Sequence, residues 1–451
     1  MDFKEVFDLF VKDAPAPAMV RATLENCFSA TEVDRIFAEN AEAQRENELL
    51  FSTVVGILQL TVLHGQKAVN SAYEQKQEEV GVSVNSVYNK LAGVELNVTR
   101  ALVRETAARK MAIVEQLGGK RETLPGYRVK IADGKHLDRT ERRLKALRGI
   151  NGAPLPGKVL AVLDADYRLV TDVIPCDDGH ASERSLFDDL QQTVEAGDLW
   201  IADRNFCTIK MLRSIVEQGA CFAIRRHGNL RPQSAGKRKR LKPCKSGTLY
   251  EEPVVVGSKD APLHLRRVEI KLKKPMRDGK KTLEILTNLP KDVSADRVAS
   301  LYRDRWTIEN AFQQIAEALN GEIQTLAYPK AALLGFSLAL VSFNLLSVVK
   351  TAIAVANDRD VETLSSYYLC QEIHMNYGGM LVILKPEFWR PKFADLNAKQ
   401  MARELLRMAK HVPNHRFQKT KTRPKGPPKN TEHKTNRPHI STKRVLEEAA
   451  C

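Results

Sequence analysis

Between residues 124 and 226, short apolar runs alternate with helical patterns, and this order restricts the fold more than any other feature of the chain. Five runs are typical of strands: one at 127–133, two within 157–175 joined by a turn near Asp164–Asp166, one at 198–203 and one at 220–226. The first and the fourth, YRVKIAD and DLWIAD, each end at a carboxylate, Asp133 and Asp203. Gly134, directly after the first, is permissive for a turn.

Two helices are predicted among these strands. The first is SERSLFDDLQQTVEAG (182–197), with Ser182 as N-cap and Gly197 as its stop, and the second is TIKMLRSIVEQG (208–219). The order is therefore three strands, helix, strand, helix and a last strand. This is the element order of a ribonuclease-H-like domain, an α/β fold with a mixed sheet flanked by helices.

The chain divides into five parts on the same grounds. Residues 1–118 are predicted to be all helical, 119–219 and 291–410 to form the two halves of the core together with C-terminal helices, and 220–290 to be a mostly β insertion with basic loops such as SAGKRKRLKPCK. The Pro-, Lys- and Arg-rich tail, 411–451, is predicted to be disordered because it has almost nothing apolar to bury. It could be a DNA-binding arm or only a solubilising tail.

Two helical segments have alternative interpretations. VSVNSVYNKLAG (82–93), with Ser83 or Asn85 as a possible cap, could be the second helix of a helix-turn-helix or an ordinary bundle helix. AALLGFSLALVSFNLLSVV (331–349) carries no charge and is nearly long enough to span a bilayer. Because Ser and Asn side chains dilute it and no second span exists, a buried core helix is favoured.

Composition limits the partners and the compartment. A net charge of +15, from 70 Lys+Arg against 55 Asp+Glu, favours polyanionic partners. The seven cysteines are scattered and never spaced C-x-x-C, so neither disulfides nor a zinc site is indicated. The N-terminus lacks the layout of a signal peptide, and we expect a reducing cytoplasm.

The stretch LYRDRWTIENAF (301–312) lies in a predicted helix, 294–319, for which Ser294 could be the cap. At about 100° per residue, Tyr302, Arg305 and Glu309 fall within roughly 60° of one another. A separate apolar stripe is available to face a core. The polar stripe is either directed at a site or is the solvated side of an amphipathic helix.

Asp133, Asp203 and Glu309 are the candidate site carboxylates. Ends of adjacent strands bring two carboxylates together, and a facing helix can supply the third. Oxygen ligands of this kind suit Mg²⁺, and a pair of such ions can promote phosphodiester displacement. The alternative is that a strand-end Asp is only a turn former, which is the interpretation for Asp164, Asp166, Asp177 and Asp178.

VKIADGKHL, DLWIADRNFCTIKML and LYRDRWTIENAF resemble the three signature regions of DDE transposases of the insertion-sequence-four class. The resemblance covers roughly residues 125–350. The third family region is Y-x2-R-x3-E-x6-K, and the chain matches it at Tyr302, Arg305 and Glu309 but has Ala316 in place of the lysine. Loss of that lysine puts one DNA-backbone contact in doubt, for which Lys330 or the basic loops could compensate.

The resemblance implies a role for each matched residue. Asp133, Asp203 and Glu309 would be catalytic and would hold Mg²⁺ or Mn²⁺. Tyr302 and Arg305 would contact DNA phosphate. The groups that support Asp203 would be Arg204 and Asn205, whereas Trp306 is expected in the core, with stacking on an extruded base as the alternative.

The activity implied is cleavage of DNA at inverted-repeat element ends and strand transfer into target DNA by a DNA-bound homodimer. The alternatives are a metal-dependent nuclease or resolvase of the same fold, and a non-catalytic DNA-binding regulator.

Overall fold

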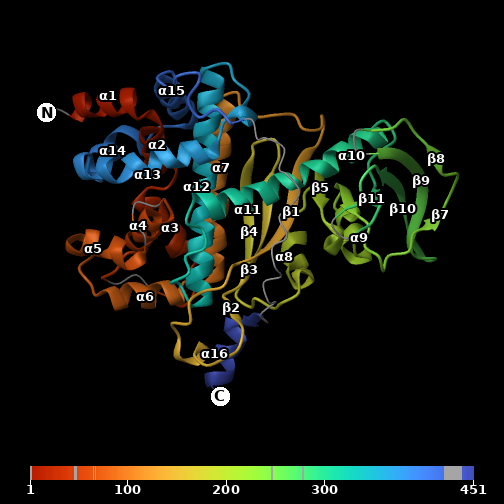
Figure 1. Cartoon of the computed structure of the whole chain (residues 1–451), viewed down its shortest axis with the longest axis horizontal. Helices are drawn as coiled ribbons and strands as arrows, with labels where there is room; N and C mark the ends of the chain where they lie inside the picture. The colour runs from red at the N-terminus through yellow and green to blue at the C-terminus, as the bar shows by residue number, and fades with distance from the viewer. Residues whose placement is uncertain are drawn as a thin grey trace.

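A mixed sheet runs through the middle of the molecule (Figure 1) in the computed structural model, which describes residues 3–44, 48–63, 66, 68–244, 247–276, 279–420 and 439–450. Its strand order is β4-β3-β1-β5-β6-β11-β10-β9-β7, and β8 pairs with β9. β3 is antiparallel to both of its neighbours, β4 and β1, whereas β5 and β6 continue from β1 in parallel. Three antiparallel strands followed by two parallel ones form a ribonuclease-H-like sheet, so the predicted fold class is confirmed.

The strands range from two to twelve residues in length. They are β1 Arg128–His136, β2 Ala153–Leu155, β3 Lys158–Asp164, β4 Leu169–Cys176, β5 Asp198–Ala202, β6 Cys221–Arg225, β7 Gln233–Ser234, β8 Lys239–Arg240, β9 Gly247–Ser258, β10 Ala261–Leu272, β11 Thr282–Thr287 and β12 His439–Ser441.

The helices of the N-terminal part are α1 Phe3–Asp13, α2 Pro15–Cys27, α3 Ala30–Asn40, α4 Phe51–Val62, α5 Val69–Val80, α6 Val84–Gly93 and α7 Leu96–Gln116. The later helices are α8 Phe187–Gln191, α9 Ile209–Glu217, α10 Ala295–Asp304, α11 Trp306–Ala318, α12 Pro329–Ala356, α13 Ser366–Ile383, α14 Pro386–Phe393, α15 Ala398–Ala409 and α16 Thr442–Ala450.

Helices cover both faces of the core strands. Because side chains alternate along a strand, Ile131 of β1 and Ile201 of β5 enter the layer that contains α7, α10, α11 and α12. Their neighbours Ala132 and Ala202 enter the opposite layer, with α8 and α9. The next residues along the two strands, Asp133 and Asp203, therefore return to the α11 side of the sheet.

Three predicted elements differ from the structure. The first strand does not end at Asp133 but continues to His136, because β3 pairs with it along that length. The helix predicted over 182–197 is a 3₁₀ turn, Glu183–Leu186, followed by the short α8. The helix predicted over 294–319 is split at Arg305 into α10 and α11, although Ser294 caps it as predicted by accepting from the N–H of Arg297.

The N-terminal helices share a hydrophobic core with the rest of the chain. α7 packs against β4, α12 and α15, and α2 packs against α13, α14 and α15 (Figure 1). Ser83 caps α6 by accepting from Ser86 N–H, and the helix packs against α12. The division into five parts, and the helix-turn-helix interpretation of α6, stay predictions.

The uncharged segment 331–349 lies within α12, the one helix of the described chain that is long and apolar enough to cross a membrane. All of its most apolar window is buried inside the molecule, between α7 and the N- and C-terminal helices. Asn344, fully buried, donates to Val170 O at 2.7 Å and accepts from Val170 N–H at 2.8 Å. The helix is thus tied to β4 by a buried amide, as a core helix would be.

Residues 439–450 depart from the prediction of a disordered tail. β12 pairs in parallel with β2, and α16 follows it. Lys443 and Arg444 form ion pairs with Asp177 and Asp178, each at 2.8 Å. These ion pairs and the strand pairing hold the segment in place although it has little apolar surface. The tail residues 421–438 lie outside the described residues.

Candidate active site

Asp133, Asp203 and Glu309 line one hollow of about 540 Å³ that is open to solvent. The last residue pair of the parallel β1–β5 ladder is Ala132–Ala202, so the two aspartates follow it side by side at the end of that ladder. Glu309 comes from α11, which contacts β1 on the same side of the sheet. Residues far apart in sequence are therefore gathered at one edge of the core.

Arg305 lies between two of these carboxylates. Its guanidinium is 3.2 Å from Asp133 Oδ2 and 2.5 Å from Glu309 Oε1. The split between α10 and α11 falls at this residue. Its positive charge offsets the repulsion that three clustered carboxylates would otherwise have.

Two backbone and amide contacts hold the Asp203 side of the hollow. Asp203 caps the 3₁₀ turn Arg204–Phe206 by accepting from Asn205 N–H at 2.6 Å. The Asn205 side chain also lines the hollow and donates to Glu183 Oε2 at 2.9 Å. Arg204 is exposed and does not line the hollow.

Tyr302 is buried on α10 and does not line the hollow itself. Burial raises the pKa of Tyr302 to about 12, although the charge of Arg305 opposes this shift. The hydroxyl therefore remains protonated at neutral pH and can donate a hydrogen bond.

The expectation that Trp306 belongs to the core is wrong, because the residue is 59% exposed. The buried face of α11 is formed by Ile308, Ala311 and Ile315. Trp306 lies roughly 200° around the helix from Ile308 and so points away from that face.

Sequence reasoning missed two charged residues of the hollow, Glu183 and Lys135. Lys135 is two residues beyond Asp133 on β1 and so shares its face, a signal that the strand period could have given. Its Nζ lies 2.8 Å from Glu322 Oε1. Glu183 had no such signal, since the turn that carries it reaches the hollow only through tertiary packing. Ala316 lines the hollow, whereas Lys330 does not.

Asp133 has the most perturbed carboxyl of the hollow. Burial raises the pKa of Asp133 to about 7; Arg305 opposes the shift, and the negative charges of Asp203, Glu309 and Glu183 add to it. A carboxylate in such surroundings gains from a nearby cation.

The pKa of Asp133 makes stability depend on pH. Since the folded protein holds this proton more tightly than the unfolded chain, the free energy of unfolding should fall as pH rises from about 4 to about 7. Asp133→Asn removes the titration. Without divalent ions, the melting temperature of the wild type should therefore fall relative to that of Asp133→Asn between pH 5 and pH 8. Parallel curves for the two proteins would contradict this assignment.

Gly134 leaves room for Glu183. A Cβ added at Gly134 would lie 2.5 Å from Glu183 Oε1 and 2.8 Å from Glu183 Cδ, so the carboxylate would have to move and its contact with Asn205 would weaken. For Gly134→Ala we expect a 10- to 100-fold slower DNA cleavage, on the scale of a displaced site group, with little change in melting temperature.

A double-substitution cycle tests this explanation. Adding Gly134→Ala to Glu183→Ala should cost nothing further, because the clash is gone. If the two rate losses multiply instead, Gly134 acts through some other contact.

The donor set of the hollow suits a hard divalent cation. The lining of the hollow contains carboxylates but no Cys or His. Carboxylate oxygens are the ligands that Mg²⁺ and Mn²⁺ prefer. Within the described ranges, however, no three His, Cys, Asp or Glu side chains are placed closely enough to hold one ion as they stand. Arg305 occupies the position between Asp133 and Glu309 instead.

Comparisons with curated proteins and with solved structures give little. No curated protein matches the chain in sequence. Among solved structures, the piggyBac transposase synaptic complex with hairpin DNA, determined by cryo-EM, is similar at a TM-score of 0.39 and 13% identity, over 91% of this chain and 85% of that chain. This likeness is too distant to bear on function.

The match to a protein family is more direct. Residues 124–345 match the family model described as "Transposase DDE domain", and this range contains Asp133, Asp203, Tyr302, Arg305 and Glu309. The chain is therefore similar to transposase DDE domains over residues 124–345.

Proposed function

We propose that the chain is a transposase of the insertion-sequence-four class that cuts DNA at element ends and joins those ends to target DNA. The observation that carries the proposal is the convergence of Asp133, Asp203 and Glu309 on one hollow within the matched domain. Carboxylates crowded in this way are unfavourable in a purely structural role, since they repel one another when no cation is present.

Asp133, Asp203 and Glu309 are the residues that would hold divalent ions, Mg²⁺ or Mn²⁺. When bound, such ions activate the attacking oxygen and stabilise the leaving oxygen of a phosphodiester. Asn205 holds the loop of Asp203 through its backbone N–H and so fixes where that carboxylate lies. The protein side of the reaction is therefore mainly positioning and charge.

Arg305 has two possible partners in this scheme. In the free protein its guanidinium neutralises Asp133 and Glu309. A DNA phosphate accepts two parallel hydrogen bonds from a guanidinium, and transfer of Arg305 to that phosphate would free both carboxylates. Tyr302 would add a single hydrogen bond to the same DNA strand, which requires its hydroxyl, buried in the free protein, to become accessible.

Ala316 stands where the family has lysine, and Lys135 is the cation of the hollow that could supply the missing charge. Both residues line the hollow, and Lys135 is now paired with Glu322. Gain or loss of one lysine–phosphate contact changes the slope of log K for DNA binding against log salt by about one.

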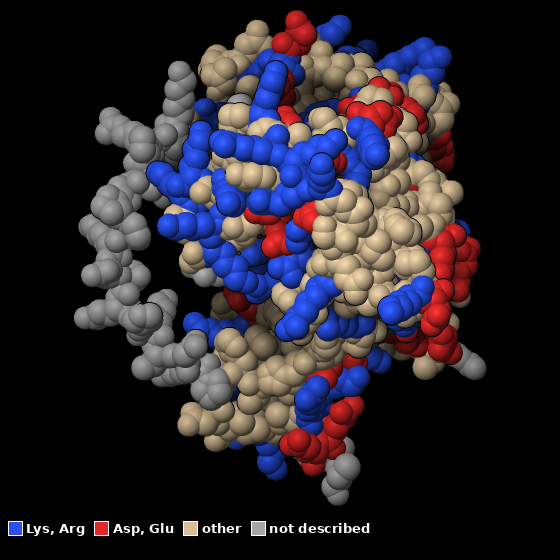
Figure 2. All heavy atoms as spheres, turned by 90° about the vertical axis from the view of Figure 1, so that its right-hand side faces the viewer, with Lys and Arg blue, Asp and Glu red and all other residues tan. Residues whose placement is uncertain are grey.

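The insertion supplies a basic surface for DNA. Figure 2 shows Lys and Arg side chains gathered over much of the face that it belongs to. The described cations of its loops and of the short strand β8 include Lys237, Lys239, Arg240, Lys242 and Lys259. Clustered Lys and Arg neutralise backbone phosphates without regard to sequence, so recognition of element ends would come from elsewhere, in our proposal from the N-terminal helices.

Incubation with end-bearing plasmid and Mg²⁺ tests the function. Joined strand-transfer products are expected. Cleavage without joining would indicate a nuclease or resolvase, and a mobility shift without cutting would indicate a DNA-binding regulator. Cross-linking on paired ends should give a dimer, because the two ends are processed together. The element ends themselves would be found as imperfect inverted repeats that flank the gene.

A further inference from the structure

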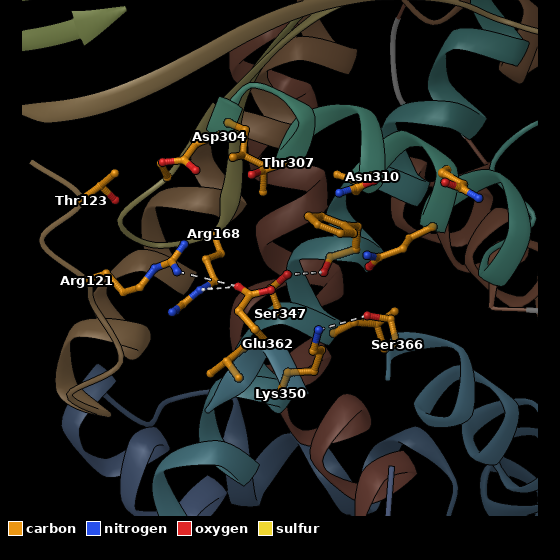
Figure 3. A pocket seen from close by; sticks show the side chains of 18 of the residues that line it. Arg121, Thr123, Arg168, Asp304, Thr307, Asn310, Ser347, Lys350, Glu362 and Ser366 are labelled. Atoms are coloured by element: carbon orange, nitrogen blue, oxygen red, sulfur yellow. Dashed lines mark hydrogen bonds and ion pairs between the residues drawn. The ribbon is translucent and has the colours of Figure 1, made fainter. Parts of the chain in front are cut away.

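A second cavity, of about 680 Å³, lies against α11 on the side away from the carboxylates (Figure 3). Thr307, Asn310 and Gln314 line it, whereas Glu309, Phe312 and Ala316 line the candidate active site. At about 100° per residue these two sets occupy roughly opposite faces of the helix. The cavity therefore lies mainly on another face of α11 than the candidate active site, with Gln313 in the lining of both.

The cavity has more positive than negative side chains. Its lining includes five cations, Arg121, Arg168, Arg297, Lys350 and Lys419, and three carboxylates, Glu122, Asp304 and Glu362. Figure 3 shows Glu362 reaching toward both Arg121 and Arg168. The distances are 3.8 Å and 3.5 Å, so one carboxylate is shared loosely between two guanidinium groups.

Lys350 is a largely buried cation in the lining of the cavity. It is the last charged residue of an otherwise apolar part of α12 and is mostly withdrawn from solvent. Its Nζ donates to Ser366 Oγ at 3.2 Å, and no carboxylate of the described residues forms an ion pair with it. Burial, and then the charge of Lys419, lower the pKa of Lys350 to about 8. An ammonium group in this position lowers stability unless something neutralises it.

The backbone of Arg168 also has an unfavourable conformation. It has a φ of 56° in the turn between β3 and β4, a conformation that a residue with a Cβ rarely adopts. Only 14% of its side chain is exposed, and its guanidinium donates to Gly119 O at 3.3 Å. The turn thus directs a guanidinium into the cavity.

We infer that this cavity binds a phosphate group, carried either by a free phosphate compound or by a DNA strand, between Lys350, Arg168 and Lys419. A guanidinium can form two hydrogen bonds to a phosphate, and an ammonium adds a compact charge. Ser366 and Thr307 supply hydroxyl groups to the lining of the cavity. The inference does not depend on the DNA chemistry proposed above.

Thermal unfolding of the full chain with inorganic pyrophosphate tests the inference, in EDTA and at constant ionic strength. The wild type should be stabilised by pyrophosphate. Lys350→Met should melt at a higher temperature without ligand, because a buried cation has been removed, and should need about tenfold more pyrophosphate for the same shift, the effect of one lost charged hydrogen bond. Lys419→Gln, at an exposed position, should need several times more pyrophosphate than the wild type for the same shift in melting temperature.

Lys399→Met is the control. It removes an exposed lysine of α15 outside the cavity and should respond to pyrophosphate like the wild type. The source of the phosphate is decided by duplex DNA binding as a function of salt. If Lys350→Met lowers the slope of log K against log salt by about one, a DNA phosphate occupies the cavity. If only the response to pyrophosphate changes, a free phosphate compound does. The inference is overturned if Lys350→Met matches the wild type in both measurements.

Discussion

Glu309→Gln should slow DNA cleavage by on the order of 10³-fold or more, while DNA binding is kept. The change removes one of the three charges that would hold the divalent ions but leaves the size of the side chain and the fold of α11 intact. Glu309 is about half exposed, so stability should hardly change. Cleavage is measured on end-bearing DNA with Mg²⁺, and affinity by gel shift with EDTA.

The control for this prediction is Glu217→Gln, which removes an exposed carboxylate of α9 at a position outside the hollow. It should cut at the wild-type rate. Persistent cutting by Glu309→Gln would show that Glu309 is not a catalytic residue, whereas a loss of DNA binding would show that it acts through the fold.

Asn344→Leu should lower the free energy of unfolding by about 3 kcal/mol, because both backbone groups of Val170 would be left buried without a partner. The Asn344 amide bonds Val170 N–H and C=O at 2.8 and 2.7 Å, and β4 is the outer strand on that side of the sheet. The measurement is chemical denaturation at equilibrium.

Ser342→Ala on the same helix is the matched control. Ser342 is equally buried, but its hydroxyl donates only to Leu338 O within α12, a bond that the backbone does not need. Its loss should change stability by less than about 1 kcal/mol. Equal effects of the two substitutions would mean that Asn344 does not tie α12 to β4.

In the part of the chain that contains the candidate active site, the ends of the predicted strands located two of the candidate carboxylates. An apolar run that stops at a carboxylate marked Asp133 and Asp203, and the order of runs and helices was enough to predict the mixed sheet. The side on which both aspartates lie follows from the strand period of two once the strands are aligned. Ser294 was identified as a cap because hydroxyl side chains satisfy the first N–H groups of a helix.

Features of the site that depend on tertiary packing could not be predicted from the sequence. Glu183 reaches the hollow because its turn lies against the turn of Asp203, and no local pattern records that contact. The break at Arg305 follows no glycine or proline, so one continuous helix was the natural prediction. Trp306 was expected in the core, whereas its place on α11 leaves it exposed.

The C-terminal residues show the same limit. Their composition predicts disorder. Composition cannot predict, however, that Lys443 and Arg444 bind Asp177 and Asp178, which lie more than 260 positions earlier in the sequence. Where such distant charges meet is a property of the fold.

Iron-directed cleavage of the protein tests the central claim most directly, that Asp133, Asp203 and Glu309 share their metal ions. Fe²⁺ in place of Mg²⁺, with DNA, ascorbate and peroxide, generates radicals that cut the backbone only near the bound ion. Cuts close to residues 133, 203 and 309 together, suppressed by excess Mg²⁺, are the result that we predict. Cuts at one or two of these positions, with the remaining segment intact, would contradict a shared site.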